Sequence, residues 1–233
     1  MINHNNKESR IIPEHLAFIM DGNRHWARER NLPIFDGHKQ GFGKISKAAE
    51  WFFSRGVRIL SVFAFSTDKW DSAQEEVNYL MKLLKETIER EIENAIVGNY
   101  RLIISGRTEE LPGDLPHLCS EAVIKTNSGN KGILNICLNY SGRQEIVDAV
   151  KKIMKNSVEL EQVHEGMIRK YLYNDLPDPN VIVRTSGEKK TSGFLLWGSI
   201  ESELIFLEKY WPDFEEVDAD TVINEYHRRM SGA

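Results

Sequence analysis

Six short apolar runs, separated by longer stretches of helical pattern, constrain the fold of this 233-residue chain most strongly. Near-continuous apolar runs are typical of strands that are buried on both faces of a parallel sheet. We therefore predict one α/β domain in which strands and helices alternate, without repeats or a long flexible linker. The predicted strands are Leu16–Met20, Ile59–Phe65, Arg101–Ser105, Ile133–Leu138, Val181–Val183 and Leu204–Leu207.

Four longer stretches carry apolar residues at the spacing of a helix with one buried face. In the longest, Glu75–Val97, this stripe fits packing on the sheet and the wall of an apolar channel equally well. The polar start of the chain predicts a disordered or loosely held arm over residues 1–12, followed by a single domain over 13–233. The predicted helices are Gly41–Arg55, Glu75–Val97, Gly142–Met154 and Leu160–Tyr173.

The charge and the cysteine content narrow the possible functions. A net charge of −5 at pH 7 argues against nucleic-acid binding, which normally requires a basic surface. Cys119 and Cys137 are the only cysteines, and they lack metal-ligand spacing, which favours a reducing cytoplasm. The chain starts without the apolar segment of a signal peptide, and no run approaches the ~18 apolar residues of a membrane span. We expect a soluble cytoplasmic protein that binds no nucleic acid.

The segment Asp21–Trp26 follows the first predicted strand, and ligands of parallel sheets bind beyond the carboxyl ends of strands. Gly22 permits close approach of a ligand, and backbone N–H groups at a helix start can hold phosphate oxygens. Asp21 supplies a hard oxygen ligand for Mg²⁺, and His38 would lie near the same anion. A plain Asp-Gly turn capped by Asn23 fits equally well, and a lone histidine is more often a surface residue.

The segment Ser66–Trp70 follows the second predicted strand. Its hydroxyls, its acid, its base and its aromatic ring could line a binding site. A capped turn with a packed tryptophan has the same composition, so this segment alone indicates little.

The segment Arg184–Gly193 follows the fifth predicted strand. It joins a strand-end arginine to a loop rich in hydroxyls and glycine with two lysines, which is a plausible cradle for a second anion. A solvated surface loop is the alternative. Glu203, one strand further on, could share a metal ion with Asp21, or it could be a buried glutamate paired with a basic side chain.

Several familiar enzyme classes lack their motifs in this sequence. Neither the Gly-rich P-loop with its lysine nor the Gly-x-Gly-x-x-Gly pattern occurs, which disfavours ordinary nucleotide enzymes. The Gly-x-Ser-x-Gly nucleophile elbow and the Asp-Asp-x-x-Asp cluster of all-helical isoprenoid synthases are also missing.

Taken together and in order, these segments resemble the cis-prenyltransferase family. The resemblance covers nearly all of the chain from His15 to Arg229, and several blocks in the right order are much more specific than any one of them. The blocks are HLAFIMDGN at 15–23, GHK at 37–39, FAFST at 63–67, LNYSGR at 138–143, RTSGE at 184–188, FLLW at 194–197 and WPDF at 211–214.

The resemblance implies a fold, a reaction and partners. The fold is a single domain with a central, mostly parallel six-stranded sheet flanked by helices and an apolar tunnel between sheet and helices. The reaction condenses isopentenyl diphosphate with an allylic prenyl diphosphate to give a cis double bond. Mg²⁺ helps the allylic diphosphate to leave, the isopentenyl double bond attacks the carbocation, and a proton is lost. The family also implies a homodimer with at most peripheral membrane association.

The resemblance also implies roles for individual residues. Asp21, Asn23 and Ser66 would be catalytic, and Asp21 with Glu203 would hold the metal ion. The substrate-binding residues would be Gly22, Asn23, Arg24, His25, Trp26, His38, Ser66, Thr67, Trp70, Glu76, Arg184, Lys190 and Ser192.

Five positions depart from the family pattern on the periphery of the predicted diphosphate sites. His25, Ile34, Ser72 and Lys190 stand where arginines are usual, and Lys69 replaces an asparagine that is proposed to assist proton removal. Each lost charge-assisted phosphate contact is worth about 1.5–3 kcal/mol. Three hypotheses follow: a chain-elongating cis-prenyltransferase with an unusual site, a diverged synthase of short or branched lavandulyl-type products, and a non-catalytic partner subunit. Retention of Asp21, Gly22 and Asn23 disfavours the third.

Overall fold

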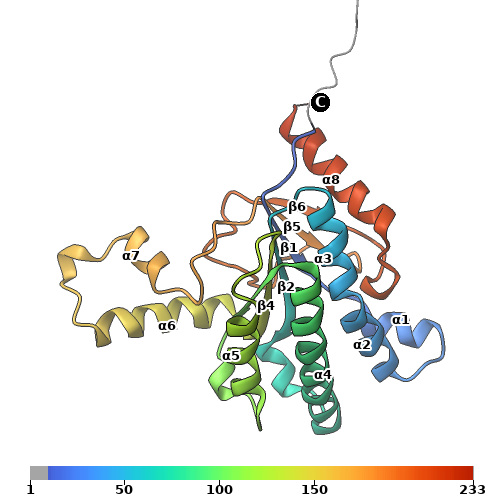
Figure 1. Ribbon diagram of the computed structural model, residues 1–233, viewed down its shortest axis with the longest axis horizontal. Coiled ribbons are helices and arrows are strands. Elements are labelled where there is room, and N and C mark those ends of the chain that lie inside the picture. Colours follow the sequence, from blue (N-terminus) through green and yellow to red (C-terminus); the bar gives the residue numbers. More distant parts are fainter. Residues whose placement is uncertain (1–9, 233) are drawn as a thin grey trace, which may run out of the picture.

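The computed structural model describes residues 10–232, which form one six-stranded sheet with all strands parallel (Figure 1). The strand order is β3-β4-β2-β1-β5-β6, so the first strand lies in the middle of the sheet. This confirms the predicted α/β class, and each of the six predicted runs overlaps a strand. The strands are β1 (His15–Ile19), β2 (Ile59–Ser66), β3 (Arg101–Ser105), β4 (Ile133–Tyr140), β5 (Val181–Arg184) and β6 (Glu203–Phe206).

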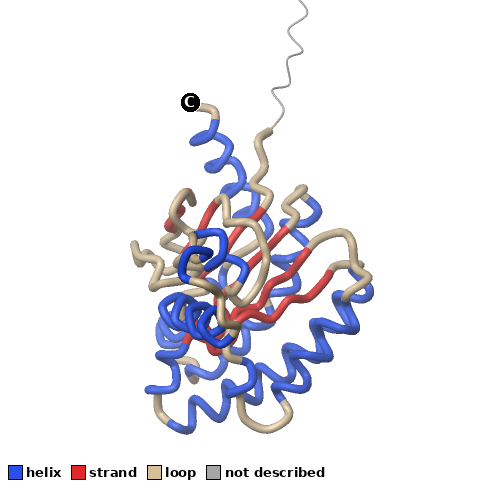
Figure 2. Tube along the Cα trace, turned by 90° about the vertical axis from the view of Figure 1, so that its left-hand side faces the viewer, coloured by secondary structure: helices blue, strands red, loops and turns tan. Residues whose placement is uncertain are grey.

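Helices cover the sheet mainly on one face (Figures 1 and 2). Leu16 and Phe18 of β1 point into this face, where α3, α4, α5 and α8 close the main core. None of the helices formed by residues 10–232 combines the length and apolar composition that a membrane span requires. The helices are α1 (Asn23–Glu29), α2 (Ile34–Gly43), α3 (Ile45–Ser54), α4 (Gln74–Gly98), α5 (Leu115–Thr126), α6 (Gly142–Lys155), α7 (Glu165–Lys170) and α8 (Glu216–Met230).

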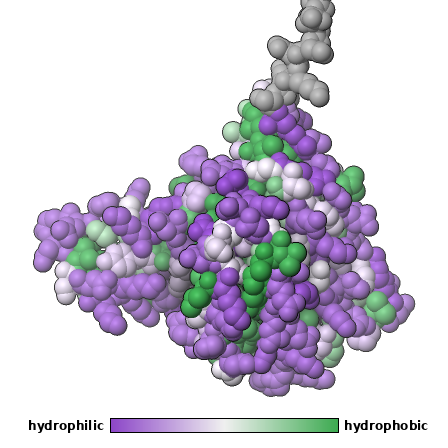
Figure 3. Space-filling model, viewed as in Figure 1, coloured by the Kyte–Doolittle hydropathy of each residue, from purple (hydrophilic) through white to green (hydrophobic). Residues whose placement is uncertain are grey.

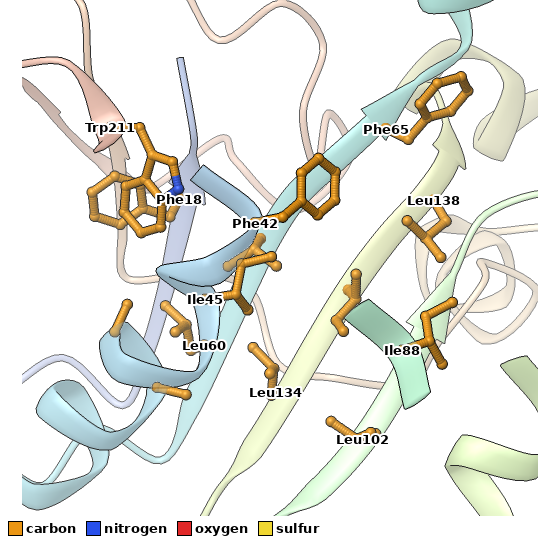
Figure 4. Close-up of a cluster of buried hydrophobic side chains, with 14 of the residues drawn as sticks. Phe18, Phe42, Ile45, Leu60, Phe65, Ile88, Leu102, Leu134, Leu138 and Trp211 are labelled. Carbon is orange, nitrogen blue, oxygen red and sulfur yellow. The ribbon is translucent and has the colours of Figure 1, made fainter. Parts of the chain in front are cut away.

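The main core is a continuous layer of apolar side chains between these helices and the sheet (Figure 4). The stripe predicted on the longest helix faces it, with Leu80, Leu84 and Ile88 all buried. Phe42 and Phe65 lie at the end of the layer that is nearest to the carboxyl ends of the strands. That end of the core is therefore the place where an apolar ligand could enter beside the strand ends.

The other face of the sheet has a smaller core and a largely irregular cover. Ala17 and Ile19 of β1 point to this side, because successive side chains of a strand alternate between faces. They pack with Phe194 and Leu195, which come from the segment 185–202 between β5 and β6. The loop that follows Arg184 thus belongs to the irregular side of the molecule.

Several helical segments differ from the sequence prediction. The expected helix Leu160–Tyr173 consists only of a short 3₁₀ turn and the six-residue α7, which buries none of its side chains. Most helical stability in proteins comes from packing of a buried face, and Gly166 weakens the helix further. α2, α5 and α8 were not predicted, and α5 buries Leu118 and Ala122 against the core beside α4.

The predicted N-terminal arm lies mostly outside the described residues. Of its residues, Arg10 donates to the Asp220 carbonyl at 3.0 Å, and the Ile11 backbone N–H donates to His227 Nδ1 at 3.1 Å. These two contacts join the start of the described chain to α8.

His15 sits at the start of β1 in a buried polar network. Its Nδ1 lies 2.7 Å from the Pro177 carbonyl, which only accepts, so Nδ1 carries the proton. Its Nε2 lies 2.8 Å from Ser61 Oγ and accepts from it, while Asn135 Nδ2 donates to the same oxygen at 2.9 Å. Burial lowers the pKa of His15 from 6.5 to about 4, so the imidazole is neutral in the fold.

This buried imidazole predicts a pH-dependent stability. Between pH 6.5 and about 4 the unfolded chain binds a proton at His15 that the folded chain does not bind. The free energy of unfolding should therefore fall by about 1.4 kcal/mol per pH unit through this group as the pH is lowered. Urea unfolding across this range should show a shallower slope for His15→Gln. The exposed His164→Gln should keep the wild-type slope, and equal slopes for all three proteins would contradict the assignment.

Candidate functional site

The carboxyl ends of three adjacent parallel strands, β2, β1 and β5, meet at one edge of the sheet. The three segments singled out in the sequence follow these strands, and the structure brings them together around a cavity of about 300 Å³. Its polar wall consists of Asp21, Gly22, Asn23, Arg24, His25, His38, Ser66, Asp68, Lys69, Arg184 and Ser192. Its apolar wall consists of Ile19, Met20, Phe42, Phe63, Ala64, Phe65 and Leu80.

An ion pair between Asp21 and Arg184 occupies the middle of this edge. Arg184 Nη2 lies 2.6 Å from Asp21 Oδ2, and Nη1 donates to Ser192 Oγ at 2.8 Å and to the Lys190 carbonyl at 2.7 Å. The arginine is only 7% exposed, whereas the Asp21 side chain is 39% exposed. Arg184 Nε is buried and has no partner among residues 10–232. The pair therefore presents a half-exposed carboxylate and an incompletely satisfied guanidinium to the cavity.

The backbone after β1 makes a left-handed turn at Gly22. Gly22 has a φ of 101°, and a Cβ atom there would lie 2.6 Å from the Tyr210 ring. Its N–H donates to Asp21 Oδ1 at 2.8 Å, which fixes the carboxylate. Only glycine fits this left-handed turn at such close approach.

A buried glutamate joins two basic residues on the β2 side of the cavity. Both Glu76 oxygens accept from Arg24 at 2.8 Å, and His38 Nε2 lies 2.9 Å from Oε1. Burial alone would raise the pKa of Glu76, but hydrogen bonds from His38 and Arg24 outweigh it and the pKa is lowered. Burial lowers the pKa of His38 despite the nearby carboxylate. The cluster therefore consists of an ionised Glu76, a neutral His38 that donates through Nε2, and a charged Arg24.

Some predicted site residues do not line the cavity. Trp26 donates through Nε1 to Asp213 at 2.6 Å, and Trp70 donates to Asn139 at 2.7 Å. Glu76 lies behind Arg24 and His38, and Lys190 directs its ammonium to Glu188 at 3.0 Å. Thr67, the first residue of the short 3₁₀ helix after β2, is half-buried outside the cavity lining.

The predicted pairing of Glu203 with Asp21 at one metal ion is wrong within a single chain. Glu203 begins β6 and pairs with Val181 at the start of β5, whereas Asp21 lies beyond the opposite ends of the strands. Glu203 is level with Leu16 of β1, and the three residue steps from Leu16 to Ile19 already correspond to about 10 Å, with Asp21 lying beyond Ile19. The Glu203 carboxylate instead binds Arg229 at 2.9 Å. The order of the apolar runs in the sequence places Glu203 near the strand that follows β5. It does not indicate at which end of that strand the residue lies.

Several residues that line the cavity were not singled out as site residues in the sequence. Phe42 and Leu80 look like any other core positions of an amphipathic helix. Asp68 was noted only as one acid of its segment, although it lines the cavity. The Arg24–Glu76 contact joins residues 52 apart, and local spacing cannot reveal it.

The sequence matches the model of a protein family described as putative undecaprenyl diphosphate synthase, over residues 19–232. It is 43% identical to an isoprenyl transferase of Fusobacterium nucleatum over 94% of each chain. It is 42% identical to a tritrans,polycis-undecaprenyl-diphosphate synthase, geranylgeranyl-diphosphate specific, of Pyrococcus furiosus, over 94% of this chain and 86% of the relative.

Two solved structures share the fold. Lavandulyl diphosphate synthase of Lavandula x intermedia, in complex with dimethylallyl diphosphate, superposes with a TM-score of 0.89 at 24% identity, covering 94% of this chain and 97% of that one. A probable undecaprenyl diphosphate synthase of Campylobacter jejuni superposes with a TM-score of 0.79 at 26% identity, covering 93% and 96%. Because the family model spans nearly the whole chain and two relatives exceed 40% identity, the protein belongs to the undecaprenyl diphosphate synthase family of prenyltransferases.

Proposed function

We propose that this protein condenses isopentenyl diphosphate with an allylic prenyl diphosphate to give a cis-prenyl diphosphate. The observation that carries this proposal is a single cavity in which polar and apolar walls meet. Asp21 lies in the middle, Arg184 and Ser192 lie on the β5 side, Arg24 and His38 lie on the β2 side, and aromatic side chains close the space behind them. Two diphosphates and one hydrocarbon tail require this combination.

The two polar sides of the cavity suit the two substrates. Arg184 and Ser192, with the unpartnered Arg184 Nε, would hold isopentenyl diphosphate. Gly22, Asn23, Arg24, His25 and His38 would surround the allylic diphosphate, with Ser66 at the reacting ends. Trp26, Thr67, Trp70, Glu76 and Lys190 would then act through their neighbours, because they do not line the cavity.

The apolar wall would receive the hydrocarbon tail of the allylic substrate. Phe42 and Phe65 lie there at the end of the main core (Figure 4), and Leu80 lines the same cavity. Burial of one five-carbon unit favours binding by roughly 3–4 kcal/mol at about 0.8 kcal/mol per CH₂. A continuous tunnel beneath α4 remains a prediction.

The residues at this edge fit a magnesium ion that is completed by substrate. Asp21 offers a half-exposed carboxylate beside the proposed diphosphate positions. Mg²⁺ is usually bound through one or two carboxylates together with substrate phosphates. Residues 10–232 contain no cluster of three or more His, Cys, Asp or Glu side chains that could hold a metal by themselves. When bound, the ion would neutralise the charge that develops on the departing diphosphate.

The protein's own groups would orient the substrates and exclude water. Arg184 would hold the isopentenyl diphosphate while Asp21 fixes the arginine, and the apolar wall would keep water from the carbocation. The allylic carbon–oxygen bond would break and release diphosphate, the isopentenyl double bond would then attack the carbocation to form the new carbon–carbon bond, and loss of a proton would restore a neutral alkene. The retained Asp21 and the similarity to the isoprenyl transferase and the undecaprenyl-diphosphate synthase named above favour an active enzyme over a non-catalytic partner subunit.

The cytoplasm is the compartment that we propose for this reaction. Cys119 and Cys137 are both buried free thiols, which suits a reducing environment. Contact with a membrane would be peripheral at most.

A second copy of the chain is the partner that we propose. α6 leads away from the body and α7 lies at the far end of this arm (Figure 1). Val147, Val150 and Met154 form an exposed apolar stripe on α6, at 49%, 41% and 73% exposure. Figure 3 shows a small apolar spot on the otherwise mainly hydrophilic arm. Exposed apolar surface on a projecting helix is typical of an interface between subunits.

Replacement of Asp21 tests the proposed reaction. Purified protein with Mg²⁺, labelled isopentenyl diphosphate and allylic diphosphates of several lengths should form a regular cis-prenyl product. Asp21→Ala should lower turnover at least 100-fold, because it removes the proposed metal carboxylate and the partner of Arg184. Its thermal unfolding should show that the fold persists.

Asp71→Ala, on an exposed aspartate outside the cavity, is the matched control and should keep wild-type turnover. If the wild type turned over none of the allylic substrates, the proposal would be contradicted. A short branched product would point to a lavandulyl-type reaction instead.

The proposed subunit contact predicts the assembly state. The wild type should have twice the 26.9 kDa chain mass in solution by light scattering. Val150→Glu with Met154→Glu places two charges in the stripe and should give a monomer with an intact circular dichroism spectrum. Ile124→Glu, on another exposed apolar residue at 75% exposure, should leave the dimer unchanged. A monomeric wild type would contradict the prediction.

A further inference from the structure

The charged side chains that line the cavity are mostly paired with each other. Arg184 is neutralised by Asp21 at 2.6 Å. Arg24 is neutralised by the buried Glu76, which accepts two hydrogen bonds from it. An incoming diphosphate therefore meets two guanidiniums whose charges are already compensated.

Lys69 differs from both arginines. Its side chain is half-buried and lines the cavity, and its ammonium makes no hydrogen bond or ion pair with any of residues 10–232. Apart from the imidazoles, Lys69 is thus the one cationic side chain among the described lining residues without a carboxylate partner. The adjacent Asp68 is exposed, and its carboxylate forms no ion pair with the Lys69 ammonium in the described structure.

The strand order places Lys69 on a definite side of the site. β1, which leads to Asp21, lies between β2 and β5. Lys69 follows β2, whereas Arg184 ends β5 on the opposite side of Asp21. His38, on the Lys69 side, is near enough for the ammonium to contribute to the lowering of its pKa. Lys69 and Arg184 therefore serve two different anion positions.

The sequence around the cavity offers few other cations on the Lys69 side. Ile34, at the start of α2, is apolar, and Ser72 is uncharged. Ser72 Oγ accepts from Arg24 at 3.2 Å and brings no charge of its own. A diphosphate bound on this side needs a compensating charge from elsewhere, and Lys69 is placed to supply it.

We propose that Lys69 is a substrate-binding residue whose ammonium anchors the diphosphate of the allylic substrate. This inference rests on the proposed function, and it makes Lys69 an anion ligand. A lysine ammonium is a compact point charge on a flexible stem, so it can follow the diphosphate oxygens where a fixed guanidinium would need exact geometry. Lys69 thus supplies the positive charge on this side of the site while Arg24 remains bound to Glu76.

The test combines kinetics with a binding measurement that needs no turnover. Lys69→Met should raise the KM for the allylic diphosphate and weaken the binding of inorganic pyrophosphate by about 10–100-fold, as expected for loss of a charge-assisted contact. Lys69→Asn should behave like Lys69→Met, because it keeps a polar group but loses the charge. Lys69→Arg should stay within about threefold of wild type. The KM for isopentenyl diphosphate should change less than threefold in every variant.

Lys82→Met is the matched control, since Lys82 is exposed on α4 and lies outside the cavity lining. It should leave both measurements unchanged. Pyrophosphate affinity and allylic KM within threefold of wild type in Lys69→Met would overturn the proposal. So would a lower kcat with both KM values unchanged, which would indicate a role in proton removal, or a rise in the isopentenyl KM alone. If the wild type turned over no allylic substrate while Lys69→Met still lost pyrophosphate binding, the proposed reaction would fail and the anion site would stand.

Discussion

The parallel pairing of β1 with β2 on one side and β5 on the other is the constraint on which the rest of the site depends. β1 is buried on both faces, so its register with both neighbours is strongly specified. The turn after Ile19 therefore has one position, in the middle of the carboxyl edge, with Ser66 on one side and Arg184 on the other. A two-substrate reaction needs such a central point with two flanks, and Asp21 occupies it.

Charge pairing at this edge follows from burial. Glu76 and Arg184 are both almost fully buried, and an unpaired charge in such surroundings would be strongly unfavourable. Arg24, His38 and Asp21 provide the partners. The fold thus holds its basic side chains in place before any substrate arrives, but it also lowers the net positive charge that a diphosphate meets. The ammonium of Lys69, which has no partner among residues 10–232, therefore contributes strongly to the net positive charge of the cavity, because the other charges largely cancel.

Structural features that depend on local periodicity could be predicted from the sequence. Positions and contacts that depend on pairing between residues far apart in the chain could not. The apolar runs located all six strands, and the stripe from Val77 to Ala95 located the buried face of α4. The position of Glu203 could not be predicted, because its level along β6 is set by pairing with Val181. The same holds for the contact of Arg24 with Glu76. α7 shows a further limit, because an apolar pattern forms a long helix only where a surface exists to bury it.

The two sides of the site are built by different kinds of structure. On the β2 side, His38 lies on α2 and Glu76 on α4, two helices that pack on each other. On the β5 side, Arg184 is held by the irregular segment that follows it, through the Lys190 carbonyl and Ser192 Oγ. Ser192 has a positive φ of 50°, which a serine adopts only when its surroundings hold it there. The allylic side therefore depends on helix packing, and the isopentenyl side depends on a loop whose shape is fixed by the arginine that it positions.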